Sequence, residues 1–234
     1  HEHEHVCTSA EVGLHCFDLV KVLGKGSYGK VMLVRHREHQ RLFAMKTLQK
    51  KMLLKKRQLL HTATERAILA QLKHPFLCKL EYAWQSPGKL SLVMNYCGGG
   101  ELFFWMQCAA DQRFSTTRTR LYTAEIFLAL KHLHHHNIVY RDLKPENVLL
   151  DQDGYCKLVD FGFARKLDTR LFTICGTMEY LAPEVLLRKG YGKGCDYWAI
   201  GVLIFEMVVG ETPWAFEDGE IAIVRAICQR EPSP

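Results

Sequence analysis

Glycines at the spacing G-x-G-x-x-G indicate a loop that binds phosphate groups. They are Gly24, Gly26 and Gly29. Dinucleotide-binding folds share this spacing, but there a helix follows the last glycine directly. Here Val31 and further apolar residues follow, which is typical of a strand. We therefore predict the tip of a β-hairpin, which either lies over phosphates with its backbone N–H groups or is a simple turn.

Charged residues and short motifs follow this loop in a definite order. Lys46 ends an apolar run, and Glu65 lies in the next helical pattern; a buried lysine needs a carboxylate partner to stay charged. Residues 140–147 read Tyr-Arg-Asp-Leu-Lys-Pro-Glu-Asn, residues 160–162 read Asp-Phe-Gly, and residues 182–184 read Ala-Pro-Glu. Chance does not explain their joint occurrence in this order and at these spacings.

The elements that position these residues differ between the two parts of the chain. In the first part, alternation of apolar and polar residues at 17–23 and short, mainly apolar segments after it predict strands within residues 17–34 and at 42–46, 77–84 and 90–94. Helical spacing of apolar residues predicts a helix at 59–72.

After the glycines at residues 98–100 the pattern becomes helical. Helices are expected at residues 117–135, 183–188, 196–209 and about 219–229, and short strands at 148–150 and 155–158. We predict an α+β fold with two lobes, the first small, antiparallel and β-rich, and the second larger and helical. The expected divisions are a tail at residues 1–16, a first lobe at 17–96 and a second lobe at 97–234.

Composition excludes several classes of protein. Apolar residues make up 48% and charged residues 24% of the chain, so neither disorder nor a collagen-like structure is expected. The net charge of +6 is mild and does not indicate a nucleic-acid partner. The longest strongly apolar run, residues 197–205, is shorter than the roughly 20 residues of a membrane span, and no secretory signal is visible. The nine scattered cysteines indicate free thiols and a reducing compartment, cytoplasmic or nuclear.

Two groups of histidines raise the question of a metal site. The first is His1, His3 and His5, and the second is His132 with residues 134–136. The first is typical of a solvated tail, and the second lies at the end of a helical pattern, where cations suit the helix dipole. No second ligand cluster with the usual zinc spacing accompanies either group, so we expect no zinc site there.

Taken together, the motifs resemble those of eukaryotic protein kinases over almost the whole chain. A narrower resemblance, to the AGC group, rests on Tyr140 and on residues 173–184. Residues 99–104 and 74–77 are most similar to Akt-like kinases and residues 160–164 to cAMP-dependent ones, so the subfamily stays open. The resemblance implies an ATP-dependent protein serine/threonine kinase with ATP and two Mg²⁺ ions as cofactors.

The resemblance also implies a catalytic set of side chains. Lys46, held by Glu65, would bind the α- and β-phosphates of ATP, and Asp142 would accept or orient the proton of the substrate hydroxyl. Asn147 and Asp160 would bind magnesium through the oxygen ligands that it prefers. The full set is Asp142, Lys144, Lys46, Glu65, Asn147 and Asp160.

ATP would be bound by the glycine loop, by apolar side chains around the adenine and by the backbone of a hinge at residues 94–97. Val31 and Ala44 would contact one face of the adenine and Leu149 the other. The set implied by the resemblance is Leu23, Gly24, Gly26, Ser27, Gly29, Val31, Ala44, Lys46, Met94, Asn95, Tyr96, Cys97 and Leu149.

Regulation is expected at Thr173, as the target of an upstream activating kinase. A phosphate there would add about −1.5 to −2 charge and would need basic partners. The resemblance supplies Arg141, Arg165 and His61. Because His61 lies one helical turn before Glu65, phosphate binding could orient that carboxylate; the alternative is an ordinary surface histidine.

Substrate preference is expected to depend on acidic side chains. Glu101, Glu146 and Glu206 match positions at which basophilic relatives bind arginine before the target residue. Lys144 and Thr177 favour serine or threonine as the acceptor. We therefore expect protein substrates with basic motifs, the alternative being that Glu206 is only a structural member of its helix.

The sequence departs from the family pattern at two places. Met178 stands where relatives usually have proline. The family pattern continues beyond residue 234 with further helices and a regulatory tail. It includes an arginine in this region that pairs with Glu184. Without that arginine Glu184 is expected to lack its partner, and a buried carboxylate without a partner is destabilising. Two functions therefore stay open, an active Ser/Thr protein kinase and a truncated, catalytically inactive ATP-binding module; the complete catalytic set favours the first.

Overall fold

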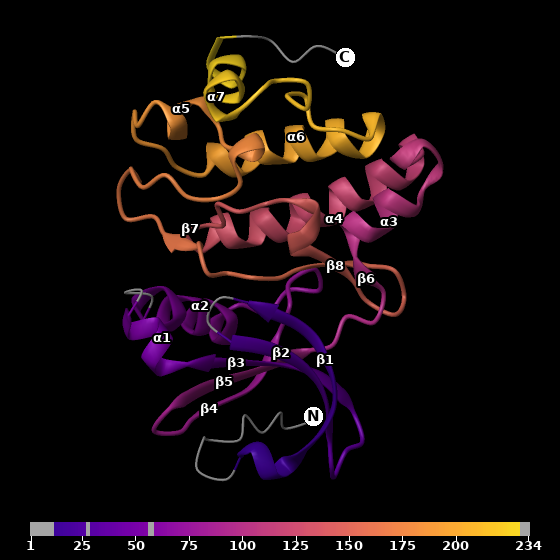
Figure 1. Ribbon diagram of the computed structural model, residues 1–234, viewed down its shortest axis with the longest axis vertical. Coiled ribbons are helices and arrows are strands. Elements are labelled where there is room, and N and C mark those ends of the chain that lie inside the picture. The colour runs from indigo at the N-terminus through magenta and orange to yellow at the C-terminus, as the bar shows by residue number, and fades with distance from the viewer. Residues whose placement is uncertain (1–11, 27–28, 56–58, 230–234) are drawn as a thin grey trace. The chain divides into compact units, whose positions relative to one another are not determined.

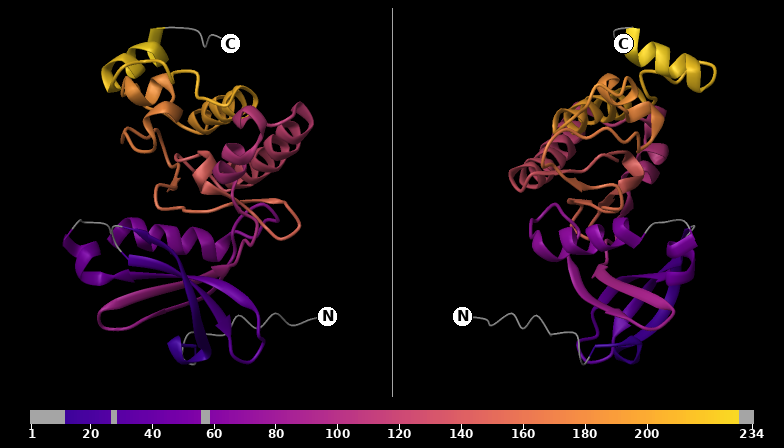
Figure 2. Two further views of the ribbon diagram at one scale, coloured as in Figure 1. Left: turned by 45° about the vertical axis from the view of Figure 1, so that its right-hand side comes forward. Right: turned by 90° about the vertical axis from the view of Figure 1, so that its left-hand side faces the viewer.

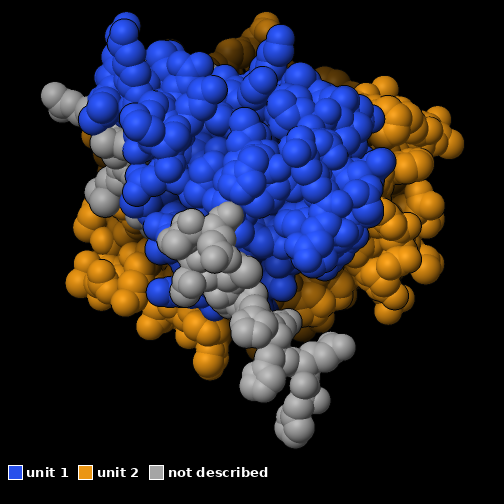
Figure 3. Space-filling model, turned by 90° about the horizontal axis from the view of Figure 1, so that it is seen from below, with its two compact units in different colours: residues 1–73, 78–97 blue, residues 74–77, 98–234 orange. Residues whose placement is uncertain are grey.

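The computed structural model describes residues 12–26, 29–55 and 59–229, with only the backbone at residues 59–61 and 64. The chain divides into two compact units, shown in different colours in Figure 3. The first comprises His1–Lys73 and Cys78–Cys97, and the second His74–Leu77 and Gly98–Pro234.

The first unit contains a five-stranded antiparallel sheet with strand order β1-β2-β3-β5-β4. Two helices, α1 and α2, pack against it (Figure 1). The elements are a 3-10 turn at Leu14–Cys16, β1 (Phe17–Gly26), β2 (Gly29–His36), β3 (Leu42–Gln49), α1 (Lys50–Lys55), α2 (Leu59–Gln71), β4 (Leu80–Gln85) and β5 (Lys89–Asn95).

Strand register places different residues on the two faces of this sheet. Val31 lies opposite Lys46, and Ala44 lies opposite Met94. Because side chains alternate along a strand and cross-strand partners share a face, these four residues lie on the same face. The other face carries the buried core of Phe17, Met32, Val34, Phe43, Met45 and Val93. The sheet therefore keeps the candidate nucleotide-binding side chains apart from its core.

The second unit is mainly helical, and its two longest helices, α4 and α6, pack side by side (Figures 1 and 2). Its short strands form the sheets β6-β8-β9 and β10-β7. The elements are β6 (Gly100–Glu101), α3 (Leu102–Cys108), α4 (Thr116–His135), β7 (Ile138–Val139), β8 (Val148–Leu150), β9 (Cys156–Leu158), β10 (Arg165–Lys166), α5 (Pro183–Leu186), α6 (Gly194–Val209) and α7 (Glu220–Gln229), with 3-10 turns at Ala110–Gln112, Pro145–Asn147 and Met178–Tyr180. No helix in the described part of the chain has the length and apolar character needed to cross a membrane.

Local sequence explains where the two long helices begin and end. Ser115 caps α4, because its hydroxyl oxygen accepts a hydrogen bond of 3.4 Å from the N–H of Arg118. Gly210 ends α6 in the left-handed conformation, at φ 98°, and its N–H donates to the carbonyl of Glu206. Glycine adopts this conformation without the strain that a Cβ atom would cause.

The predicted α+β class is confirmed, and the structure adds two short helices. The helix α1 has only six residues, too few to reveal a period. In α3, Leu102 and Met106 are buried one turn apart, but the exposed aromatic residues 103–105 hide that pattern. The strand predicted at residues 77–84 begins later, at Leu80, because Leu77 forms an isolated bridge with Leu158 of the second unit.

Candidate active site

An ion pair between β3 and α2 is the main polar feature of the first unit. The Nζ atom of Lys46 lies 2.6 Å from Oε1 of Glu65, and the Glu65 side chain is only 5% exposed. Lys46 shares its face of the sheet with Val31 and Ala44. The pair expected from the sequence is therefore present, and it fixes the lysine on the face that carries the candidate adenine contacts.

The glycine loop contains one position where the backbone itself requires glycine. A Cβ atom on Gly29 would lie 1.8 Å from the carbonyl oxygen of Thr47, whereas Gly24 and Gly26 have open space around them. Leu23 is partly exposed at the end of β1, and Ser27 lies outside the described residues. The close approach of β2 and β3 therefore explains Gly29, and the other two glycines remain candidates for phosphate contact.

The segment 94–97 contains the last two residues of β5 and ends at Cys97, which is buried. The N–H of Asn95 donates to the carbonyl of Lys79 at 3.1 Å, so the backbone here is held by the neighbouring strand. The side-chain Oδ1 of Asn95 is buried and accepts no hydrogen bond from the described residues. Met94 lies beside Ala44 in register, and Leu149, the expected second adenine contact, belongs to β8 of the second unit.

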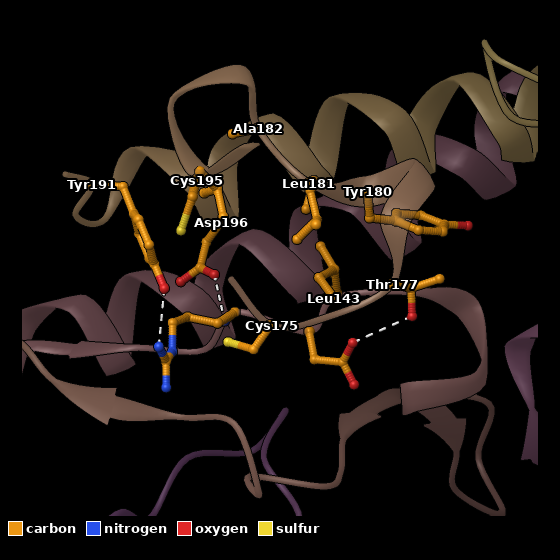
Figure 4. Close-up of a pocket in the computed structure, with 13 residues that line it drawn as sticks. Leu143, Cys175, Thr177, Tyr180, Leu181, Ala182, Tyr191, Cys195 and Asp196 are labelled. Carbon is orange, nitrogen blue, oxygen red and sulfur yellow. Dashed lines mark hydrogen bonds between the residues drawn. The ribbon is translucent and has the colours of Figure 1, made fainter. Parts of the chain in front are cut away.

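In the second unit, the carboxylate of Asp142 is held from several sides. The Nδ2 atom of Asn147 donates to its Oδ2 at 2.8 Å. The hydroxyl of Thr177 donates to its Oδ1 at 3.4 Å, as the dashed line at Thr177 marks in Figure 4. Lys144 donates to the Thr177 hydroxyl at 2.9 Å and lies 3.9 Å from the carboxylate. The structure therefore brings together three residues of the 140–147 motif and Thr177.

The pKa of Asp142 is raised above its ordinary value. Burial is the main cause; the positive charge of Lys144 opposes it, and the nearby charge of Asp160 adds to it. A raised pKa makes a carboxylate a stronger base, provided that it is still ionised at the working pH. Asp142 is thus held in one orientation and is more basic than an exposed aspartate.

The same region offers a set of oxygen atoms suited to a divalent cation. Asn147 uses Nδ2 to donate to both the carbonyl and the carboxylate of Asp142, which leaves its amide oxygen to act as a ligand. Asp160 is exposed, at φ 54°, and its charge raises the pKa of Asp142. Two neighbouring carboxylates and an amide oxygen are the hard ligands that Mg²⁺ prefers, so these residues fit the ion.

Asp196, at the start of α6, holds the backbone at Tyr140 and Arg141, the first two residues of the 140–147 motif. It is not among the residues predicted from the sequence. Its side chain is 1% exposed and accepts hydrogen bonds from the N–H groups of Tyr140 at 2.9 Å and Arg141 at 2.8 Å. The Nε2 atom of His134 lies 2.7 Å from the same carboxylate. These contacts hold Arg141 at φ 71°, a conformation that is costly for a residue with a side chain. The sequence feature that could have indicated Asp196 is its position as an acidic residue in the first turn of a strongly apolar helix.

Tyr191 connects Arg141 to the backbone of Thr173. The guanidinium of Arg141 donates to the Tyr191 hydroxyl at 3.0 Å, as the dashed line at Tyr191 marks in Figure 4. That hydroxyl donates in turn to the Thr173 carbonyl at 2.6 Å. The Thr173 side chain is exposed. Arg165 lies in β10, paired with β7, while the side chain of His61 lies outside the described part of the chain.

Glu206 is buried on α6 and accepts a hydrogen bond from the hydroxyl of Tyr180. Burial, together with the charges of Glu146 and Glu179, raises the pKa of Glu206 to about 7, against the lowering effect of the Tyr180 hydrogen bond. Glu146 is thus near Glu206, whereas Glu101 is an exposed residue of β6. The contact with Tyr180 gives Glu206 a structural partner, and arginine binding by this residue remains a prediction.

Gly176 lies against the backbone of Arg141, and we expect its replacement by alanine to lower both stability and activity. Its φ is 105°, and a Cβ atom would lie 2.7 Å from the carbonyl oxygen of Arg141. Gly176→Ala should therefore lower the free energy of unfolding by about 1–3 kcal/mol and reduce activity by displacing Asp142. The matched control is Gly154→Ala, which has a similar φ of 86° but open space around the added atom. Equal behaviour of the two variants in thermal unfolding and turnover would show that the contact with Arg141 has no effect.

Comparisons with known proteins identify the family of this chain. The model of the protein kinase domain family matches residues 17–232. Protein kinase 2 of Dictyostelium discoideum is 48% identical over 85% of the chain and 41% of its own length. The serine/threonine-protein kinase YPK1 of Saccharomyces cerevisiae is 48% identical over 86% of the chain and 30% of its own length. RAC-beta serine/threonine-protein kinase A of Xenopus laevis is 46% identical over 90% of the chain and 43% of its own length.

The chain thus spans less than half of the length of these three relatives. The relatives confirm the resemblance to the AGC group that the motifs indicated. With a family model that covers nearly all of the described residues, the chain belongs to the protein kinase domain family.

Proposed function

We propose that this chain transfers the γ-phosphate of ATP to serine or threonine hydroxyl groups of proteins. The observation that supports the proposal best is the arrangement around Asp142, in which Asn147 and Thr177 orient the carboxylate beside the ammonium group of Lys144. A hydroxyl placed at the free side of this carboxylate could give up its proton to Asp142 while its oxygen is phosphorylated.

Each remaining polar group has a role that follows from its chemistry. Lys46, fixed by Glu65, would bind the α- and β-phosphates, and Lys144 would neutralise charge on the transferred phosphate. Asn147 and Asp160 would hold Mg²⁺, for which we propose two ions. Bound magnesium would supply positive charge against the phosphate oxygens. The chain's own residues would orient the carboxylate and the ammonium groups, so that little rearrangement is needed during transfer.

Thr173 is the proposed site of activation by an upstream kinase. Its carbonyl is joined through Tyr191 to Arg141, the residue next to Asp142. A phosphate on the exposed Thr173 hydroxyl would have the guanidinium of Arg141 as one proposed partner and Arg165 as the second. Phosphorylation would thereby stabilise the conformation that holds the catalytic base.

Glu206, Glu146 and Glu101 are proposed to bind arginine before the phosphorylated residue. An arginine side chain reaching Glu206 would need the carboxylate to be ionised, and the pKa of Glu206 is raised to about 7. A guanidinium stays charged throughout the physiological range. Affinity for such substrates should therefore depend on pH near neutrality.

The corresponding test compares KM at different pH values for a serine peptide with arginine before the serine. As pH falls from about 8 to 6, Glu206 becomes protonated, so KM should rise several-fold while a peptide with alanine in place of arginine changes little. Glu206→Gln, which keeps the contact with Tyr180, should have a high KM at every pH. A wild-type KM for the arginine peptide that does not vary between these pH values would refute the role of Glu206.

A catalytically inactive ATP-binding module is the alternative that the sequence left open. The position and hydrogen bonds of Asp142 do not favour it, because a module that only binds nucleotide has no need of an oriented carboxylate next to a lysine. Phosphorylation of serine and threonine peptides, but not of the same peptides with alanine at the acceptor, would support the proposed kinase.

A further inference from the structure

The turn between β2 and β3 holds two histidines and a glutamate close together. One ring nitrogen of His36, one of His39 and one carboxylate oxygen of Glu38 lie within 4.8 Å of one another. Within the described part of the chain, no other group of three or more His, Cys, Asp or Glu side chains meets this spacing. It lies in the first unit and shares no residue with the candidate nucleotide-binding set.

The backbone of this turn is already ordered. The N–H of His36 donates to the carbonyl of Arg41 at 2.9 Å, and the N–H of Gln40 donates to the carbonyl of His36 at 2.8 Å. The N–H of Arg37 donates to the carbonyl of Cys16 at 2.9 Å, which ties the turn to the start of β1. A ligand that uses these side chains would therefore lose little free energy in ordering the backbone.

His36 is a fixed ligand in this group. Its side chain is 7% exposed, with the edge of the ring against Phe17 at 5.1 Å and its face against Tyr82 at 5.7 Å. Packing between these aromatic rings fixes the position of His36 before any metal ion binds.

The other two ligands can move toward it. The side chains of His39 and Glu38 are 53% and 77% exposed, and His39 Nε2 lies 3.8 Å from the glutamate oxygen. The ring of His39 stacks on that of His36 at 4.6 Å, and the backbone N–H of His39 lies 3.4 Å from Nδ1 of His36, the long limit of a hydrogen bond. A tetrahedral zinc ion needs ligand atoms about 3.3 Å apart. Rotation of the two exposed side chains would have to bring their ligand atoms closer by roughly 1.5 Å to reach this geometry.

Two arginines near this turn contact groups other than Glu38. Arg37 forms an ion pair of 2.9 Å with Asp18, and the guanidinium of Arg41 lies over the ring of Phe43 at 5.5 Å. Arg35 faces Asp18 in the strand register. The carboxylate of Glu38 thus remains available to a metal ion.

We propose that His36, His39 and Glu38 form a binding site for one Zn²⁺ ion, with water in the fourth position. Two imidazoles and a carboxylate are a common zinc ligand set, whereas Mg²⁺ prefers oxygen ligands throughout. The bound ion would join the β2–β3 turn to the aromatic core that holds His36.

The test must separate this site from the other histidines of the chain. His1, His3 and His5 lie outside the described residues and could bind zinc themselves, so the background is the full chain with these three replaced by alanine. Zinc affinity is measured by competition with a chromophoric chelator, and Co²⁺ absorption reports the coordination. His39→Ala and Glu38→Ala alter exposed side chains, so neither is expected to disturb folding. The matched control is His135→Ala, which removes an exposed histidine from α4.

We expect one zinc equivalent in this background, unaffected by millimolar Mg²⁺, with the affinity reduced about tenfold or more by His39→Ala and by Glu38→Ala. His135→Ala should leave the affinity unchanged. The Co²⁺ complex should show the strong visible absorption of a tetrahedral site. Unchanged affinity in the His39 and Glu38 variants, or an equal loss in the His135 variant, would overturn the proposal.

Discussion

Replacement of Asp142 by asparagine should lower the rate of phosphate transfer by about 10²- to 10⁴-fold, the usual contribution of a positioned acid or base. Asparagine has nearly the same shape, and its amide oxygen can still accept the hydrogen bond from Asn147. Its NH₂ group can donate to the hydroxyl oxygen of Thr177, which lies 3.4 Å from the present carboxylate. The variant should therefore fold normally and lose the group that accepts the proton.

The measurement is kcat for a serine peptide, together with the Kd for Mg·ATP and the melting temperature. The exposed residue Asp153, whose replacement by asparagine removes the same charge from a surface turn, is the control. A rate for Asp142→Asn close to that of the Asp153 variant would show that Asp142 is not the base. A loss of Mg·ATP binding equal to the loss of rate would instead place Asp142 in ion binding.

Removal of the Asp196 side chain should have the largest effect on stability. Asp196→Ala leaves two buried N–H groups, those of Tyr140 and Arg141, without an acceptor and takes away the partner of His134. Breaking a buried polar cluster of this kind costs about 3–5 kcal/mol. Because these N–H groups belong to the segment that leads into Asp142, activity should be lost as well.

Denaturant unfolding followed by circular dichroism gives the change in free energy. Should the alanine variant be too unstable to purify, Asp196→Asn supplies the answer, since it keeps one acceptor oxygen and should lie between the wild type and alanine. Asp168→Ala removes an exposed acid and serves as the control. A change of less than about 1 kcal/mol in both Asp196 variants would mean that other contacts hold the catalytic segment.

Local patterns were sufficient to predict the elements that carry the candidate site. A short apolar run predicted β3, and helical spacing predicted α2, so Lys46 and Glu65 could be assigned to a strand and to the next predicted helix before their 2.6 Å contact was known. The motif at residues 140–147 is short, and its own geometry brings Asn147 to Asp142. Predictions of this kind succeed where the partners are close in sequence or lie on elements with a clear period.

Long-range side-chain contacts with the backbone could not be predicted in this way. Asp196 binds N–H groups 55 and 56 residues earlier in the chain, and backbone groups carry no sequence signal. The contact between Tyr180 and Glu206 likewise depends on how α6 packs against the turn at Met178–Tyr180. An acid in an apolar helix indicates that a partner is needed, but only the fold identifies the partner.

Catalysis of phosphate transfer is distinguished from mere nucleotide binding by equilibrium binding of Mg·ATP and transfer of radiolabelled γ-phosphate to a serine peptide, both determined on the same preparation. We expect binding together with transfer, one phosphoserine formed for each ADP released, and loss of the transfer alone in Asp142→Asn. Binding of Mg·ATP by the wild-type chain without any formation of phosphoserine, or transfer that is equal in the Asp142→Asn protein, would contradict this expectation.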